Sequence, residues 1–93
     1  MAKHRELLAS VSQVRSIRRH IASLTDRERD VMTWVISGTL NKQIADELGI
    51  AIQTVKVHRG RVMEKMGVVS VAELVRLCAS AGFAAVDHGT KVQ

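Results

Sequence analysis

The chain has little of several features on which other protein classes depend. It contains no proline and no tyrosine, and only one tryptophan and one phenylalanine among its 93 residues. So few aromatic rings leave little for stacking unpaired bases, which argues against single-stranded nucleic acid as a ligand. With 46% hydrophobic and 25% charged residues the overall balance is ordinary for a globular protein. The composition suits one small helical domain.

Cysteine and long apolar runs are equally scarce. The single cysteine, Cys78, cannot form an internal disulfide, and Cys and His are not grouped at metal-ligand spacing, so we expect no metal and no cofactor. No apolar run approaches the roughly 18 residues that a membrane span needs, and nothing resembles a signal peptide. The sequence contains no nucleophile with a base, no paired carboxylates and no phosphate loop, so nothing in it indicates an enzyme. The sequence predicts a cytoplasmic, non-enzymatic protein with no membrane partner, in which Cys78 is a small buried apolar residue rather than a redox group.

Positive charge exceeds negative charge, and the excess is unevenly distributed. Of the net charge of +5, residues 1–23 carry +4, with five Lys or Arg against one acid. Residues 24–93 hold nine bases against eight acids, and four of those bases lie between residues 56 and 65. A basic cluster of this kind makes nucleic acid a candidate partner, although charge alone does not distinguish it from a solvated basic surface.

Two helix starts carry a capping box, in which a Ser or Thr and the Glu three residues later accept each other's backbone hydrogen bonds. The boxes and the helices that they open are Thr25 with Glu28 (about 26–37) and Ser70 with Glu73 (about 71–81). Between them, Asn41 as cap and Gly49 as terminator bracket a short helix. A longer basic helix of about 52–66 follows after a three-residue turn. A short helix, a turn containing glycine and a basic helix form the helix-turn-helix pattern, so the expected fold is an all-α, four-helix domain.

The N-terminal segment has apolar residues at spacings of three and four, which favour one stripe of a helix. They are Leu7, Val11, Val14, Ile17, Ile21 and Leu24. Because sustained heptads are missing, a linker or docking helix and a flexible segment both remain open. The expected organisation is a linker over 1–23, the helix-turn-helix domain over 24–83 and a tail over 84–93.

A helical wheel gives the basic helix two different faces. The apolar face, expected in the core, consists of Ile52, Val55, Val62, Met63 and Met66. The opposite face shows Gln53, Lys56, Val57, Gly60 and Glu64, flanked by Thr54, Arg61 and Lys65. A helix in the DNA major groove needs long donors for guanine edges or phosphates and a small apolar group for a thymine methyl. Lys56 and Val57 suit these two tasks.

The joint spacing of L-T-x-R-E, N-K-x-I-A, T-V-K-x-H and K-M resembles the LuxR-type helix-turn-helix domain of two-component response regulators. The resemblance runs from Leu24 to about Phe83, and HRxxVMxKM with SVAELVRL is most similar to the FixJ-like branch. It implies a sequence-specific DNA-binding domain that regulates transcription. Residues 1–23 resemble the linker to a receiver domain that is absent here, so we expect a piece of a longer protein, with a stand-alone protein as the alternative.

The resemblance also implies roles for individual residues and partners. Base-reading positions match Lys56, Val57 and Gly60; phosphate-binding positions match or adjoin Asn41, Lys42, Thr54, His58, Arg61 and Lys65. The fourth helix would form a weak two-fold contact through Val71, Leu74, Val75 and Cys78, the alternative being that a four-helix domain simply uses a wide apolar face there. Promoter DNA and RNA polymerase are the other implied partners. Two departures weaken the match: Ala51 replaces a capping Ser or Thr, and Gly60 lacks the side chain of a longer donor.

Some residues keep two interpretations at this point. His58 is either a structural histidine or a phosphate contact. Arg59 falls toward the apolar side, where we expect an ion pair with an acid of the first or second domain helix, Glu28 being one possible partner. Two other functions also remain open: a promoter-reading domain like that of a sigma factor, and an interaction module that sequesters a partner regulator.

Overall fold

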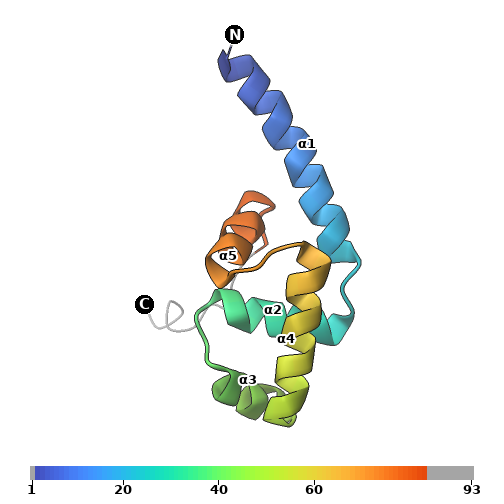
Figure 1. Cartoon of the computed structure of the whole chain (residues 1–93), viewed down its shortest axis with the longest axis vertical. Helices are drawn as coiled ribbons and strands as arrows, with labels where there is room; N and C mark the ends of the chain where they lie inside the picture. The colour runs from blue at the N-terminus through green and yellow to red at the C-terminus, as the bar shows by residue number, and fades with distance from the viewer. Residues whose placement is uncertain (1, 84–93) are drawn as a thin grey trace.

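The computed structural model describes residues 2–83, and this part of the chain consists of five α-helices without a strand. They are α1 (Ala2–Ala22), α2 (Asp26–Ile36), α3 (Asn41–Leu48), α4 (Ile52–Met66) and α5 (Val71–Ser80), as Figure 1 shows. The expected all-α, four-helix domain with a preceding helix is confirmed. In the described part, no helix combines the length and apolar character needed to cross a lipid bilayer. The predicted tail over 84–93 lies outside the described residues.

The N-terminal segment is a helix whose last turns join the domain. Along its apolar stripe, Ile17 is buried and Val14 and Ile21 are half-buried, whereas Val11 is 46% exposed. The Nε atom of Arg18 donates to the backbone oxygen of Ala81 at 3.4 Å, which ties α1 to the end of α5. α1 thus lies against α4 and α5 at its C-terminal end and leads away from them at the other (Figure 1). The side chain of Leu7 is outside the described part.

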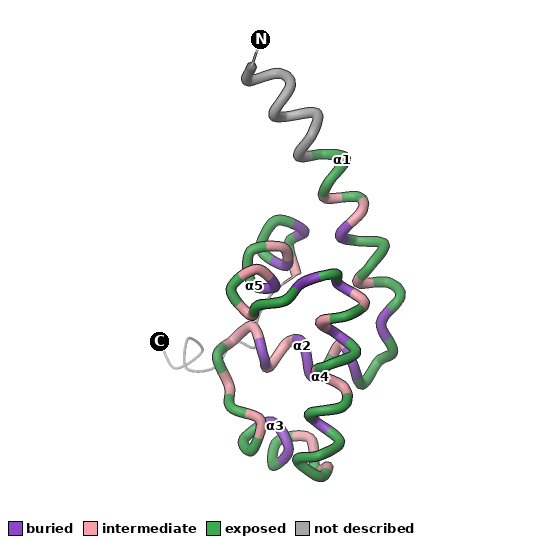
Figure 2. The backbone as a smooth tube through the Cα atoms, viewed as in Figure 1, coloured by how far each residue is buried: buried purple, intermediate pink, exposed green. Residues whose placement is uncertain are grey.

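The core lies around α2, which packs against α3, α4 and α5, and Figure 2 shows the buried stretches of these helices. Its fully buried hydrophobic members are Val31, Met32, Ile44, Val55, Val62, Met66, Leu74 and Cys78. The inner face predicted for α4 is therefore correct except at Ile52, which is 40% exposed. Ile52 is the first residue of α4, where no neighbouring helix covers its side chain fully.

The apolar residues of α5 divide differently from the prediction. Leu74 and Cys78, which we expected in a contact between two copies, are 0% and 1% exposed within the domain itself. The Cys78 thiol donates to Met32 Sδ at 3.8 Å, and burial raises its pKa to about 11. Residues so enclosed cannot also form an intermolecular surface, which corrects their assignment. Val75, at 39% exposure, and the half-buried Val71 remain on the outside of α5.

Candidate nucleic-acid interface

A tight turn sets α3 against the start of α4. Gly49 follows α3 in the left-handed region at φ +66°, a conformation that glycine adopts without a Cβ penalty. The amide of Ile50 then donates to Ala45 O at 3.0 Å and closes the turn. As expected, Ala51 gives α4 no side-chain cap. The two helices therefore cross near the N-terminal end of α4, as a helix-turn-helix requires (Figure 1).

The face of α4 opposite the core is open. Lys56, Val57, Gly60 and Arg61 are all exposed, with Val57 at 51%. Among the described residues, neither Lys56 nor Arg61 makes a hydrogen bond or ion pair with another protein group. Because long cationic side chains that form no internal hydrogen bond or ion pair keep their charged ends in water, they are free to meet an external anion. The structure thus brings the predicted base-reading residues together on one accessible helix face.

Asn41 is not the cap of α3, contrary to the prediction. The N-cap is Leu40, whose backbone amide donates to Gln43 Oε1 at 3.2 Å. Asn41 is the first helical residue, and its Oδ1 accepts a 2.9 Å hydrogen bond from Arg59 Nη1. The expectation of an acidic partner for Arg59 is therefore wrong, because within the described chain its partner is a neutral amide.

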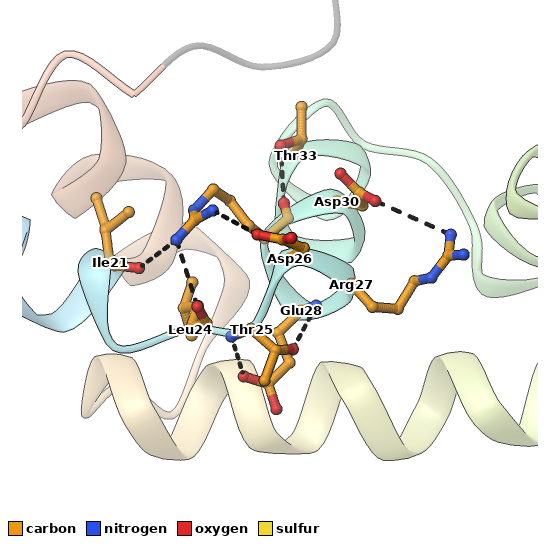
Figure 3. A network of polar contacts seen from close by, with 9 residues as sticks. Ile21, Leu24, Thr25, Asp26, Arg27, Glu28, Asp30 and Thr33 are labelled. Carbon is orange, nitrogen blue, oxygen red and sulfur yellow. Dashed lines mark hydrogen bonds and ion pairs between the residues drawn. The ribbon is translucent and has the colours of Figure 1, made fainter.

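Lys65 has an internal partner that the sequence did not reveal. Its Nζ lies 2.7 Å from Glu28 Oε1 and also donates to Ser23 O at 3.3 Å. Glu28 is 1% exposed, and its carboxylate also accepts from Thr25 N in the predicted capping box, next to α4 in Figure 3. Hydrogen bonds from Lys65 and Thr25 lower the pKa of Glu28 against the opposing effect of burial. Lys65 thus neutralises a buried carboxylate, a placement that does not fit the phosphate contact we expected of it.

His58 is also partly enclosed by the domain. The ring of His58 is half-buried, and its Nδ1 atom is enclosed without a hydrogen-bond partner among the described residues. An enclosed nitrogen cannot reach a phosphate group outside the domain. Of the two interpretations, the structural one applies to Nδ1, and a contact with phosphate is left only to Nε2.

The join between α1 and α2 depends on Arg29, to which sequence reasoning assigned no role. Its Nη2 donates to Leu24 O at 3.3 Å and Ile21 O at 3.5 Å, and its Nη1 pairs with Asp26 at 3.3 Å (Figure 3). Carbonyls at the end of a helix lack intrahelical partners. Ile21 O, in the last turn of α1, accepts from Leu24 N at 3.1 Å and in addition from Arg29. The available signal was an arginine one turn after a helix start, which is too common to be informative.

The model of the family described as "Bacterial regulatory proteins, luxR family" matches residues 22–78. The chain belongs to the luxR family. Its fold is accordingly the LuxR-type helix-turn-helix domain, a DNA-binding domain of transcription regulators, and the resemblance inferred from the motif spacing is confirmed.

Three proteins show how similar this LuxR-type domain is to known regulators. It is 42% identical to Nodulation protein W of Bradyrhizobium diazoefficiens over 91 residues, which cover 98% of the chain and 38% of that protein. It is 46% identical to Transcriptional regulatory protein FixJ of Azorhizobium caulinodans over 72 residues, which cover 77% of the chain and 34% of that protein. The crystal structure of full-length FixJ from B. japonicum superposes with a TM-score of 0.75 at 43% identity. The match covers 82% of this chain and 37% of the FixJ chain. The chain therefore spans little more than a third of the length of these proteins.

Proposed function

We propose that this LuxR-type domain binds double-stranded promoter DNA sequence-specifically, with α4 in the major groove. The observation that carries the proposal is the division of α4 into two faces. Val55, Val62 and Met66 fix one face in the core, while Lys56 and Val57 stand on the other. A rigid helix with exposed donors and a small apolar group is the arrangement that reads base edges in the major groove.

The proposed contacts divide into two kinds. Lys56 and Val57 meet bases, and Gly60 lets the helix approach the groove floor closely. The phosphate contacts come from both helices of the motif: Asn41, Lys42, Thr54, His58 through Nε2, and Arg61. Phosphate contacts set the register and contribute salt-dependent affinity, whereas base contacts set the choice of sequence. Lys65 is left out of this set because its ammonium pairs with Glu28.

The domain's place in a whole regulator is part of the same proposal. A receiver domain preceding α1 controls it, and two copies meet weakly through the outer face of α5, where Val75 is exposed. Such a dimer presents two recognition helices to two half-sites. The regulator acts in the cytoplasm on RNA polymerase at the promoter. The similarity to FixJ, a transcriptional regulatory protein of which this chain covers only a part, supports this arrangement.

Affinity for DNA as a function of salt tests the proposal. A fragment selected from a random DNA pool should bind the unsubstituted chain with a steep negative salt slope. Replacing both Lys56 and Arg61 with alanine should flatten the slope by roughly 0.9 for the phosphate that Arg61 no longer neutralises. Binding should weaken at least tenfold, because Lys56 no longer reaches a base either. The charge-matched control replaces Arg15 and Arg76, exposed cations on α1 and α5, and should change the slope much less.

Other outcomes would support the competing functions. Equal slopes for the two double variants would overturn DNA binding through α4 and favour the interaction module. If the domain alone binds DNA weakly and adding RNA polymerase makes binding strong, the sigma-factor-like alternative is favoured. Both measurements use the same fragments and salt series.

Gly60→Ala should stabilise the free domain and alter its DNA preference. Nothing lies within 4 Å of a Cβ added at Gly60, and its backbone is helical, so alanine gains about 1 kcal/mol of helix propensity. The same methyl group projects from the DNA-facing side of α4. Urea unfolding should show the gain, and selection from a random pool should return a changed sequence. Unchanged selection would make Gly60 a tolerated surface residue.

A further inference from the structure

Arg59 and Asn41 link the two helices of the motif. They stand 18 positions apart in the chain, and Arg59 Nη1 donates to Asn41 Oδ1 at 2.9 Å. Both side chains are half-buried at the junction of α3 and α4. Arg59 forms no ion pair within the described residues, so this amide is its polar partner. Because Asn41 is neutral, this hydrogen bond does not balance a negative charge.

The chemistry of the pair determines which way the amide of Asn41 points. A guanidinium carries donors only, so the group of Asn41 that faces Arg59 must be the oxygen. The NH₂ group of the same planar amide therefore faces away from Arg59. In the described part of the chain, Asn41 Nδ2 donates to no protein group. Two N–H donors are thus held in a fixed direction at the edge of the domain.

The surroundings of this amide favour an anion. Asn41 is the first residue of α3, where backbone N–H groups lack intrahelical acceptors and the helix dipole is positive. The exposed Lys42 follows directly. Together these groups supply donors and positive potential for one phosphate oxygen.

We propose that Arg59 is a positioning residue for DNA binding, which holds the Asn41 amide so that its NH₂ group donates to a backbone phosphate. This inference rests on the proposed function. It explains why an arginine occurs on the inner flank of α4, where it reaches neither bases nor acids. Without Arg59, the amide can rotate and present its oxygen to the phosphate, which repels it.

A double-mutant cycle tests the coupling between the two residues. The variants are Asn41→Ala, Arg59→Met and the double substitution, and the probe is DNA selected from a random pool by the unsubstituted chain. Each single substitution should weaken binding about fivefold, because one hydrogen bond to phosphate is removed or misdirected. Arg59→Met should cost much less once Asn41 is alanine, since no amide remains to be positioned. Independent, multiplicative losses would overturn the proposal.

A second variant separates positioning from a merely structural link. Asn41→Asp keeps an acceptor for Arg59, so resistance to urea should be retained, but it presents carboxylate oxygens to the phosphate. Binding should fall at least tenfold. The matched control Gln43→Glu adds the same charge in the same turn and keeps an acceptor for Leu40 N, so its loss of affinity should be smaller. Equal losses for the two acidic variants would show that Asn41 makes no directed contact.

The same experiments distinguish this inference from the proposed function. A steep salt slope that depends on Lys56 and Arg61 establishes DNA binding whatever the cycle shows. If the slope is steep and the cycle shows no coupling, the positioning role alone is overturned. If the unsubstituted chain selects no DNA, the proposed function fails, and the role of Arg59 toward DNA fails with it.

Discussion

Leu74→Ala should lower the free energy of unfolding by about 2 to 5 kcal/mol, which is a large part of the stability of a small domain. Leu74 is 0% exposed and packs in the cluster that contains Met32 and Cys78. Removing its branched end forfeits the transfer free energy of the buried atoms and leaves a cavity between α2 and α5. Urea unfolding followed by far-ultraviolet circular dichroism measures the change.

The neighbouring Val75→Ala is the matched control for Leu74→Ala. Val75 is 39% exposed on the outer side of the same helix, so its truncation should change stability by no more than about 0.5 kcal/mol. Unfolding of the Leu74 variant should also be independent of protein concentration, because Leu74 packs within a single chain. A destabilisation that grows on dilution would instead return Leu74 to an interface between two copies.

Local signals were sufficient to predict the four helices of the domain, α2 to α5, but left α1 open between a helix and a flexible segment. The capping box of Thr25 and Glu28 appears as expected, with both hydrogen bonds formed, and Gly49 and Gly67 end their helices in the left-handed region. These features depend on residues three or four positions apart, so their geometry is contained in the sequence itself. The open face of α4 followed from helical periodicity for the same reason.

Contacts between helices could not be predicted in this way. Arg59 and Lys65 lie on the flanks of α4, and a helical wheel does not show which neighbouring side chain reaches each flank. Their partners, Asn41 and Glu28, are 18 and 37 positions away and are selected by how the helices cross. The prediction for Leu74 failed for a related reason, because a wide apolar face does not show which part the domain itself covers. The exposure of residues on the outer face of α4 was therefore easier to predict than the partners of residues on its flanks.

Lys65→Met should destabilise the domain by about 2 to 4 kcal/mol at neutral pH, somewhat less than breaking a fully buried pair costs. The Glu28 side chain is 2% exposed and Lys65 is 35% exposed, so the ammonium retains some water that the carboxylate lacks. Methionine keeps the packing of the aliphatic stem but leaves the buried carboxylate without its cation. Lys56→Met, on the exposed face of the same helix, is the control and should be nearly neutral.

The cost of Lys65→Met should shrink as the pH falls. The Lys65 hydrogen bond holds the pKa of Glu28 below its ordinary value of 4.5, so this stabilisation is complete above that value and is lost as the pH falls through the lowered pKa. Without Lys65 the pKa of Glu28 in the folded state is higher, and the carboxyl protonates first in the variant. The difference in stability between the unsubstituted chain and the variant therefore shrinks as the pH falls from the folded-state pKa of Glu28 in the variant to its lower pKa in the unsubstituted chain. Urea unfolding over a series of pH values measures this difference.

The double variant Glu28→Gln with Lys65→Met separates charge from packing. Its neutral amide oxygen still accepts from Thr25 N, so the capping bond at the start of α2 is kept. No buried charge then lacks a cation, and the double variant should recover part of the stability that Lys65→Met alone removes, with little remaining dependence on acid pH from this site. A double variant as unstable as the single one would mean that Lys65 acts through its bond to Ser23 O rather than through the Glu28 carboxylate.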